Sequence, residues 1–181
     1  MYFKGLIPHT QNQHPPPRHE AILAVDRKSG IGKNKTLPWH NPQDLRRFRD
    51  LTESATMVMG SNTFFSLPIN KRPLPGKHRR SIVLTFDPEA LKFDAYRHTE
   101  NLQIMDLDSF RAAYSSEDRA TMFFIGGADL YRTLIDEIRE LHLTTIHGDY
   151  QCDTFVRVDS ALWTVTHREE HGDHTYAVLI K

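Results

Sequence analysis

Short apolar runs alternate with polar, glycine-bearing segments along most of the chain. The first run, residues 21–25, is apolar throughout, which is typical of a strand buried on both faces of a parallel sheet. Four later segments are also expected to be strands, at residues 56–60, 81–85, 102–105 and 121–125, and those at 56–60 and 121–125 are mainly apolar. Helices are expected between the runs, one beginning near Pro42 and others at residues 108–115 and 129–135. Junctions from a strand to a helix of this kind are common in α/β domains.

The C-terminal part of the chain has a different pattern. Residues 140–146, 162–166 and 176–180 are expected to be strands, and the polar stretch 168–174 connects the last two. Such a connection predicts an antiparallel hairpin at the edge of the sheet. Its acidic and imidazole side chains lack a fixed helical spacing, so a solvated turn without a metal ion is expected. These side chains belong to His167, Glu169, Glu170, His171, Asp173 and His174.

Length and charge narrow the class of protein. The 181 residues suffice for one domain with a sizeable core. With 23 basic and 23 acidic residues, the balanced charge favours neither nucleic acid nor an anionic membrane as a partner, so a small molecule is the expected ligand. The single cysteine, Cys152, excludes an internal disulfide and fits a reducing compartment. We therefore expect a cytoplasmic monomer without a membrane-spanning segment.

Residues 1–18 have no helical or strand periodicity and contain Pro15-Pro16-Pro17. They are expected to form a mobile extension that precedes a single domain at residues 19–181. A targeting role for this extension is disfavoured, because it carries only one Lys and one Arg.

An acidic residue stands near the start of the helix that begins at Pro42. Asp44, Leu45 and Phe48 are spaced to share one helical face, whereas Arg46, Arg47 and Arg49 are expected to point mostly elsewhere. An isolated Asp near a helix start is usually a solvated acid favoured by the helix dipole. Here it follows Leu37-Pro38-Trp39 and a polar, glycine-bearing loop at residues 26–36, which would lie over a pocket as a lid. The alternative to a solvated acid is therefore that Asp44 lies in a pocket beneath this loop.

Two strand ends carry glycines directly before a helix start. Gly60 is followed by Ser61-Asn62-Thr63, and Gly126-Gly127 precede the helix expected at residues 129–135. The free N–H groups at such junctions can bind phosphate, and glycine lets the backbone approach a ligand closely. Neither junction has the Gly-x-Gly-x-x-Gly pattern, which disfavours an ordinary dinucleotide domain of Rossmann type.

Taken in order over residues 20–181, these segments resemble the dihydrofolate reductase family. The motifs are Ile22-Leu23-Ala24-Val25, Gly30-Ile31-Gly32-Lys33-Asn34, Leu37-Pro38-Trp39, Asp44 with Phe48, Met59-Gly60-x-x-Thr63, Arg72-Pro73-Leu74-Pro75-Gly76, Ile125-Gly126-Gly127-x-x-x-Tyr131, Leu143-Thr144 and Asp153-Thr154-Phe155. The resemblance implies a three-layer αβα fold around an eight-stranded, mostly parallel sheet with a C-terminal antiparallel hairpin. It also implies an oxidoreductase of one-carbon metabolism that reduces 7,8-dihydrofolate with NADPH and binds antifolates.

The resemblance assigns roles residue by residue. Asp44 would hold the pterin and support its protonation, Trp39 would help to order a water molecule, and Thr144 would hydrogen-bond the acid. Substrate contacts are implied for Ile22, Leu23, Ala24, Asp44, Leu45, Phe48, Ser66, Leu67, Leu74, Arg79, Ile125 and Thr144. Cofactor contacts are implied for Ala24, Ile31, Gly32, Gly60, Ser61, Asn62, Thr63, Leu84, Thr85, Phe86, Ile125, Gly126, Gly127, Ala128, Asp129, Leu130 and Tyr131. The peptide bond between Gly126 and Gly127 would be cis.

Some positions depart from the family pattern. Family members have an arginine that binds the glutamate carboxylate of the substrate, and this arginine corresponds to Arg79. Two extra residues after Gly76 leave Lys77 as the other candidate for this role. The basic residues expected around the adenosine 2'-phosphate are replaced by Ser61 and Phe86. Thr85 and Asn62 remain there as neutral donors, and Arg97 or His98 could supply a charge from elsewhere. NADPH is therefore expected to be preferred over NADH by a reduced margin.

Two other functions remain open from the sequence. A pyrimidine reductase of riboflavin synthesis shares the fold and the cofactor junctions, but is not expected to combine Trp39, Asp44 and Phe48 with Arg79. A pterin- or nucleotide-binding module without catalysis is the other alternative. The intact Asp44 argues against it.

Overall fold

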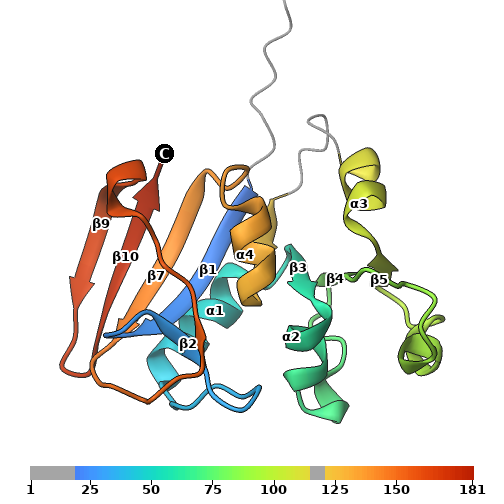
Figure 1. Ribbon diagram of the computed structural model, residues 1–181, viewed down its shortest axis with the longest axis horizontal. Helices are drawn as coiled ribbons and strands as arrows, with labels where there is room; N and C mark the ends of the chain where they lie inside the picture. Colours follow the sequence, from blue (N-terminus) through green and yellow to red (C-terminus); the bar gives the residue numbers. More distant parts are fainter. Residues whose placement is uncertain (1–18, 115–120) are drawn as a thin grey trace, which may run out of the picture.

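One twisted eight-stranded sheet forms the centre of the computed structural model, which describes residues 19–114 and 121–181 (Figure 1). The strand order is β5-β4-β3-β6-β1-β7-β10-β9. The strands are β1 His19–Asp26, β3 Thr56–Gly60, β4 Arg80–Leu84, β5 Leu102–Met105, β6 Met122–Phe124, β7 Glu140–Ile146, β9 Thr164–Glu170 and β10 His174–Ile180. The pairs from β5 to β7 are parallel, and β10 is antiparallel to both β7 and β9. The expected sheet with its C-terminal hairpin is confirmed, whereas the extension at residues 1–18 lies outside the described residues.

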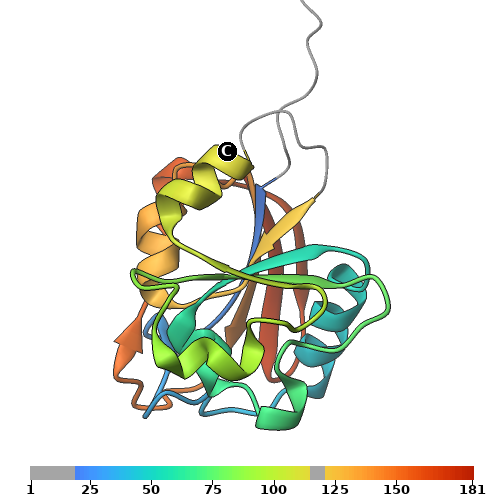
Figure 2. The same cartoon turned by 90° about the vertical axis from the view of Figure 1, so that its right-hand side faces the viewer.

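Helices cover both faces of the sheet. They are α1 Pro42–Leu51, α2 Ser61–Ser66, α3 Leu107–Ala113 and α4 Ala128–Leu134, with 3-10 turns η1 Ile69–Lys71, η2 Leu91–Tyr96 and η3 Ser160–Leu162. Figure 2 shows α3 and α4 on one side and α1 on the other. The three-layer arrangement is therefore confirmed. Across the described residues, no helix combines the length and apolar character needed to span a membrane.

The central strands are buried because helices pack on both of their faces. Ala21, Val58 and Phe124 have no exposed surface, although they stand on three different strands. Burial on both sides leaves no solvated face that would favour polar residues, which explains the unbroken apolar runs. The carboxyl ends of these parallel strands meet at one edge of the sheet, where an α/β fold typically binds its ligands.

The C-terminal hairpin differs from the expectation at its turn. β9 continues to Glu170 and β10 begins at His174, so most of the stretch predicted to be a connection is strand. Arg168 and Glu169 pair with Ala177 and Tyr176. The prediction was wrong because β9 is mostly exposed at the edge of the sheet, and an exposed strand needs no apolar pattern.

Helix ends also shifted by one or two residues. The helix expected at residues 108–115 begins at Leu107, because the Asp106 side chain accepts a hydrogen bond from the Ser109 N–H and caps it. The helix expected at residues 129–135 is α4, which begins at Ala128.

A second, two-stranded sheet was not predicted. Its strands are β2 Gly30–Gly32 and β8 Thr154–Phe155, which pair in antiparallel fashion. The buried carboxylate of Asp26 accepts hydrogen bonds from the N–H groups of Lys28 and Gly30, each at 2.8 Å. Burial by itself would raise the pKa of Asp26, but backbone hydrogen bonds from Gly30, Tyr150 and Lys28 lower it. The loop over the sheet edge is thus fixed by an ionised buried acid.

Candidate active site

The predicted acid and its threonine are in contact. Asp44 stands in the first turn of α1, and Thr144 is a buried residue of β7. The Thr144 hydroxyl donates a hydrogen bond of 2.6 Å to Oδ1 of Asp44, as the resemblance implied. Ala24 pairs with Thr144 across the β1–β7 ladder, so the carboxylate lies over two central strands of the sheet.

The first turn of α1 is fixed by its cap. The Asn41 side chain accepts hydrogen bonds from the N–H groups of Gln43 and Asp44, at 3.1 and 2.9 Å. The same amide group donates to Oδ2 of Asp173 at 3.1 Å. The start of the helix, and Asp44 with it, is therefore attached to the turn between β9 and β10.

One turn further along α1, Arg47 forms a second attachment. Its guanidinium lies 3.7 Å from the centre of the Tyr176 ring, and Nη2 lies 2.6 Å from a carboxylate oxygen of Glu169. Thr144, Tyr176 and Glu169 are successive cross-strand partners on β7, β10 and β9. Asp44 and Arg47 therefore contact neighbouring members of one row. The expectation that Arg47 points away from the site was wrong, because this row supplies both a ring face and a carboxylate for it.

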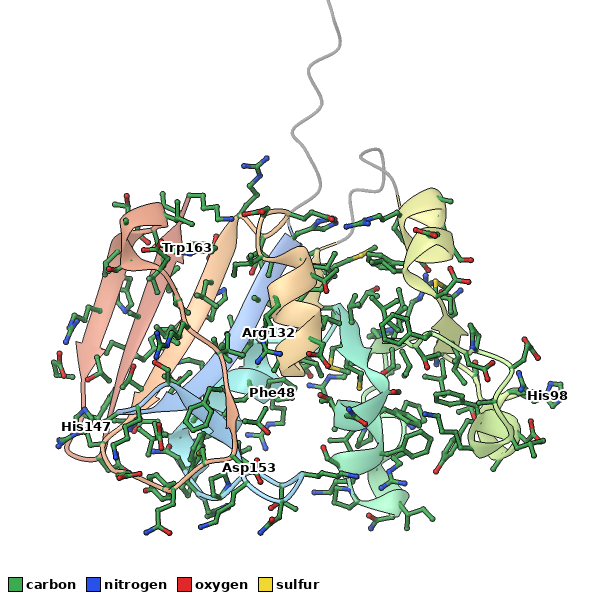
Figure 3. All side chains as sticks on the ribbon, viewed as in Figure 1. Phe48, His98, Arg132, His147, Asp153 and Trp163 are labelled. Carbon is green, nitrogen blue, oxygen red and sulfur yellow. The ribbon has the colours of Figure 1, made fainter. Side chains whose placement is uncertain are left out.

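The apolar side of α1 is narrower than expected. Phe48, labelled in Figure 3, is half-buried and packs against the cluster of Met57, Met59, Phe64, Val83 and Phe93. Leu67, Leu74 and Ile125, which were also implied to line the folate pocket, pack against the same cluster. Leu45 is 43% exposed, and α1 buries no residue fully. The helical face that was expected to be buried and apolar is therefore partly open to solvent.

Trp39 stands three residues before the start of α1. Its ring is only 8% exposed and meets the edge of Tyr150 at a centroid distance of 5.3 Å. The buried indole N–H finds no acceptor among the described side chains and backbone groups. A buried donor of this kind is suited to bind an ordered water or a ligand.

The two glycine junctions are adjacent. The Gly60 N–H donates to the Gly126 carbonyl at 2.7 Å, and the Gly126–Gly127 peptide is cis, as expected. The φ angle of Gly126 is +125°, which strains any residue with a side chain, and a Cβ atom there would also make a tight contact of 3.2 Å with Oγ1 of Thr63. Neither α2 nor α4 has a side-chain cap at its N-terminus. The first N–H groups of both helices are therefore available to an anion.

Several residues implied to contact ligands have side chains engaged elsewhere. Leu23 and Leu130 belong to the main core, and Asp129 forms a 2.8 Å ion pair with Arg132, which is labelled in Figure 3. Ser66 donates its hydroxyl to the Thr63 carbonyl at 2.7 Å. Tyr131 is buried and donates to the Ile22 carbonyl, and burial raises the pKa of its hydroxyl. Only backbone atoms of Leu23 and Leu130 remain for a ligand.

The outer part of the predicted cofactor site is exposed. Phe86 is fully exposed and Asn62 is exposed, while Ser61, Leu84 and Thr85 are half-buried. Arg97, one of the considered sources of charge, is already paired with Asp94 at 2.9 Å and Glu89 at 3.0 Å. His98 projects outward beyond η2 in Figure 3.

Arg79 is buried against the end of α1. Its guanidinium donates to the carbonyls of Thr52 and Arg49, each at 2.9 Å, and to the carbonyl of Pro75 at 2.5 Å. The rival Lys77 is exposed. The structure therefore gives Arg79 a fixed orientation beside the helix that carries Asp44.

Sequence reasoning missed Asp26, Asn41 and Arg47, although each holds part of this site. Ile31 and Gly32 were expected near the cofactor, and they lie in or beside the β2–β8 pair. Asp153, labelled in Figure 3, closes that segment, because its carboxylate accepts a 2.7 Å hydrogen bond from the Asn34 N–H. The Asn41 cap could have been found from Asn before Pro at a helix start.

Comparison with known proteins identifies the family to which the chain belongs. The family described as dihydrofolate reductase matches residues 19–180. The chain is 34% identical over 151 residues to the dihydrofolate reductase of Bacillus subtilis strain 168, with 82% of each chain covered. It is 33% identical over 156 residues to a bifunctional dihydrofolate reductase-thymidylate synthase of Arabidopsis thaliana, of which it covers 26%.

A solved structure is also similar. It is dihydrofolate reductase from Enterococcus faecalis complexed with NADP(H) and RAB-propyl, at 28% sequence identity and a TM-score of 0.74. The similarity covers 90% of this chain and 95% of the other.

Proposed function

The chain belongs to the dihydrofolate reductase family and reduces 7,8-dihydrofolate to 5,6,7,8-tetrahydrofolate with NADPH, and we propose that Asp44, Thr144 and Trp39 carry the proton chemistry of this reaction. The observation that carries the proposal is the 2.6 Å hydrogen bond from Thr144 to Asp44 at the carboxyl ends of β1 and β7. This contact supports the proposal because Asp44 is the only carboxylate that the motifs assign to the site.

Asp44 binds and orients the substrate ring. The reaction needs a fixed geometry, exclusion of bulk water and one acid-base group, because a hydride adds to C6 of the pterin while N5 gains a proton. When bound, NADPH supplies that hydride. The Asp44 carboxylate accepts hydrogen bonds from N3–H and the 2-amino group of the pterin, which favours the protonated ring. Thr144 occupies one lone pair of the carboxylate and so fixes its orientation.

Trp39 assists the proton step through its indole N–H. The group is buried and aimed away from protein acceptors within the described chain, so it can hold a water molecule near N5. Asp44 supplies the negative charge that makes protonation of N5 favourable. The proton itself arrives through this water, because the carboxylate is engaged with the opposite edge of the ring.

Arg79 is the proposed partner of the substrate's glutamate carboxylate. Its guanidinium donates to three backbone carbonyls and to the Thr52 hydroxyl, all of them neutral acceptors among the described residues. A buried positive charge without a counter-ion favours an anionic ligand. Lys77 is the less suitable candidate, because its ammonium is exposed to solvent, where its charge is screened.

The cofactor site is proposed around the paired glycine junctions. The uncapped N–H groups at the starts of α2 and α4 suit the pyrophosphate, and Gly60, Gly126 and Gly127 allow its close approach. Ser61 and Thr85 are the proposed neutral donors for the adenosine 2'-phosphate. The exposed ring of Phe86 is available to the adenosine.

We further propose that residues 19–181 form the catalytic domain of a cytoplasmic monomer. The family match over residues 19–180 supports the domain bounds. The single cysteine and the balanced charge support the compartment and the small-molecule partner.

The direct test is the loss of the near-ultraviolet absorbance of NADPH, followed with and without dihydrofolate. Oxidation that depends on dihydrofolate and falls sharply in Asp44→Asn is expected. Oxidation that continues unchanged in this variant would show that Asp44 has no part in the reaction.

A further inference from the structure

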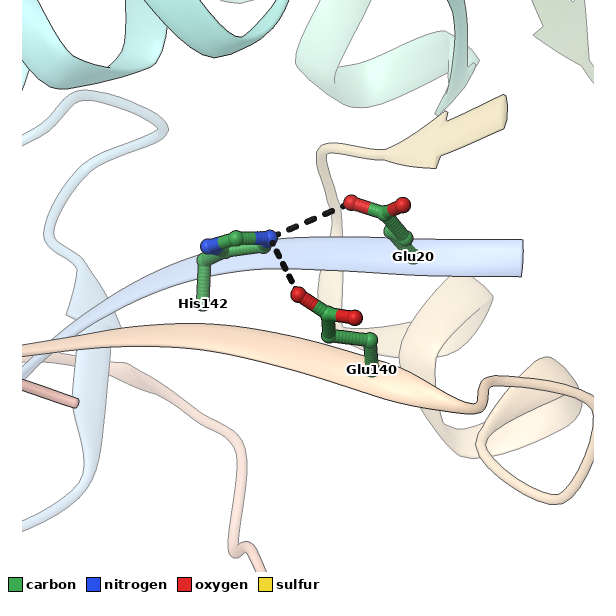
Figure 4. Close-up of side chains that lie close together, drawn as sticks. All are labelled: Glu20, Glu140 and His142. Atoms are coloured by element: carbon green, nitrogen blue, oxygen red, sulfur yellow. Dashed lines mark hydrogen bonds and ion pairs between the residues drawn. The ribbon is translucent and has the colours of Figure 1, made fainter. Parts of the chain in front are cut away.

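Three side chains that the proposed reaction does not use converge on the face of the sheet that α1 covers. They are Glu20 on β1 and Glu140 and His142 on β7 (Figure 4). Glu20 and Glu140 are cross-strand partners, and His142 follows Glu140 by two residues, so all three project from the same face. None of them was identified from the sequence as a site residue.

The cluster is separate from the active site. Glu140 precedes Thr144 by four residues along β7, which places it about 13 Å away at the rise of an extended strand. The site of Asp44 lies toward the carboxyl ends of the strands, whereas Glu20 and Glu140 lie toward their amino ends. A ligand at the cluster therefore need not contact dihydrofolate.

The distances suit a metal ion. Nε2 of His142 lies 3.1 Å from Oε2 of Glu20 and 3.3 Å from Oε1 of Glu140, and the three atoms lie within 4.8 Å of one another. Nitrogen and oxygen ligands at about 2.1 Å from a zinc ion are separated by roughly 3.0 to 3.4 Å in octahedral or tetrahedral geometry. The two distances from the imidazole fall in that interval.

Hydrogen bonding satisfies the cluster only in part. Nε2 of His142 carries at most one hydrogen, so it can make one good hydrogen bond while two carboxylates face it. No Lys or Arg of the described residues pairs with Glu20 or Glu140. Since the Glu20 side chain is only 11% exposed, its negative charge is costly without a cation.

Tyr176 completes the environment expected of a metal-binding histidine. Its hydroxyl oxygen lies 2.7 Å from Nδ1 of His142. When Nδ1–H donates to this oxygen, the lone pair of Nε2 is directed at the two carboxylates, which is the form that binds metal. The Glu140 side chain is 34% exposed, so an ion can reach the site from solvent.

We propose that Glu20, Glu140 and His142 bind one divalent transition-metal ion of the zinc class. One imidazole nitrogen with two carboxylate oxygens favours such an ion over Mg²⁺, which prefers oxygen ligands alone. Three protein ligands leave a fourth position for water. The ion links β1 to β7, the two strands over which Asp44 lies, and so stabilises the folded sheet.

The test uses the full chain without an affinity tag, freed of metal by a chelator. Titration with ZnCl2 is followed by calorimetry, and CoCl2 is used in parallel because its visible absorption reports the coordination. We expect one equivalent of Zn²⁺, a higher melting temperature, and no comparable binding of MgCl2. Failure of the wild-type chain to bind Zn²⁺ saturably would overturn the proposal.

Two nearly isosteric variants locate the ion. Glu20→Gln and Glu140→Gln each remove one ligand charge, and affinity for Zn²⁺ is expected to fall at least about tenfold, with the far-ultraviolet circular dichroism unchanged. Tyr176→Phe removes only the hydroxyl behind His142 and is expected to cost about 10- to 100-fold in affinity. If Glu20→Gln does not fold, the affinity of Glu140→Gln for Zn²⁺ decides the question, because the Glu140 side chain is partly exposed and its replacement should be tolerated.

A matched control separates this cluster from the imidazoles of the C-terminal hairpin. His171→Asn removes a ring nitrogen that lies 3.2 Å from a carboxylate oxygen of Glu169. The proposal expects this variant to retain the full equivalent of Zn²⁺. Binding that is lost in His171→Asn but kept in Glu140→Gln would place the ion on the hairpin and refute the assignment.

Discussion

The two ends of the active site are built differently. At the pterin end, the Thr144 side chain contacts Asp44 directly, and Asn41 and Arg47 attach its helix to Asp173 and Glu169, which are far away in the sequence. At the adenosine end, Ser61 is half-buried and Phe86 is fully exposed, and the neighbouring glycine junction is held by a backbone hydrogen bond between Gly60 and Gly126. In the proposed assignment, selectivity for the pterin depends on charges held in place, whereas selectivity for the cofactor depends on the shape of the glycine backbone.

The largest effect is expected from the charge of Asp44. Asp44→Asn keeps nearly the same shape and can still receive the Thr144 hydrogen bond, but it loses the charge that supports protonation of N5. The rate at neutral pH should fall about 10²- to 10⁴-fold. The loss should shrink as the pH is lowered, since dihydrofolate is then partly protonated in solution. A pH profile of kcat for both proteins measures this, and a loss that is constant with pH would contradict the role.

Arg79→Ala should weaken ligands that carry a glutamate and spare those that do not. A charge-assisted hydrogen-bonded pair contributes about 1.5 to 3 kcal/mol, which corresponds to roughly 10- to 150-fold in KM for dihydrofolate and Kd for methotrexate. Trimethoprim, which has no glutamate, should bind almost as before. Lys77→Ala is the matched control, and the same selectivity in that variant would transfer the role to Lys77.

Arg47→Met tests whether the second attachment of α1 positions Asp44. The variant keeps apolar contact with Tyr176 but loses the ion pair and the cation–π contact, each of which contributes about 0.5 to 1 kcal/mol at a partly exposed site. We expect kcat to fall about three- to tenfold with little change in KM. Arg47→Lys should restore part of the loss. A purely structural role would lower the melting temperature while leaving kcat of the folded enzyme unchanged.

The smallest effect is expected at the adenosine end. Ser61→Arg adds a charge beside the proposed 2'-phosphate site, and an exposed pair contributes about 0.2 to 1 kcal/mol. The ratio of kcat/KM for NADPH to that for NADH should rise about two- to fivefold, mainly through KM for NADPH. The gain should vanish at high salt. An unchanged ratio at low salt would indicate that another basic residue already binds the phosphate.

These two ends were also not equally predictable from the sequence. The buried strands and both glycine junctions follow from local pattern, and Asp44 with Thr144 follows from the family resemblance. Arg47 could not be placed, because its partner Glu169 is 122 residues away and helical spacing alone pointed it elsewhere. The β2–β8 pair is too short to leave a periodic pattern. The role of Asp26 could not be predicted either, since its partners are backbone N–H groups that no side-chain motif reveals.

The exposed strand β9 has a consequence for how the molecule behaves at high concentration. Its outer edge presents unpaired backbone groups, which in many proteins recruit a strand from a second molecule and start aggregation. Here the edge is covered with charge, since Arg168 pairs with Glu170 and His167 lies 2.9 Å from Glu169. A second strand that docks on this edge would bring its backbone beside these charged side chains, which disfavours the contact. The same polar residues that obscured β9 in the sequence thus make it a poor template for fibril growth.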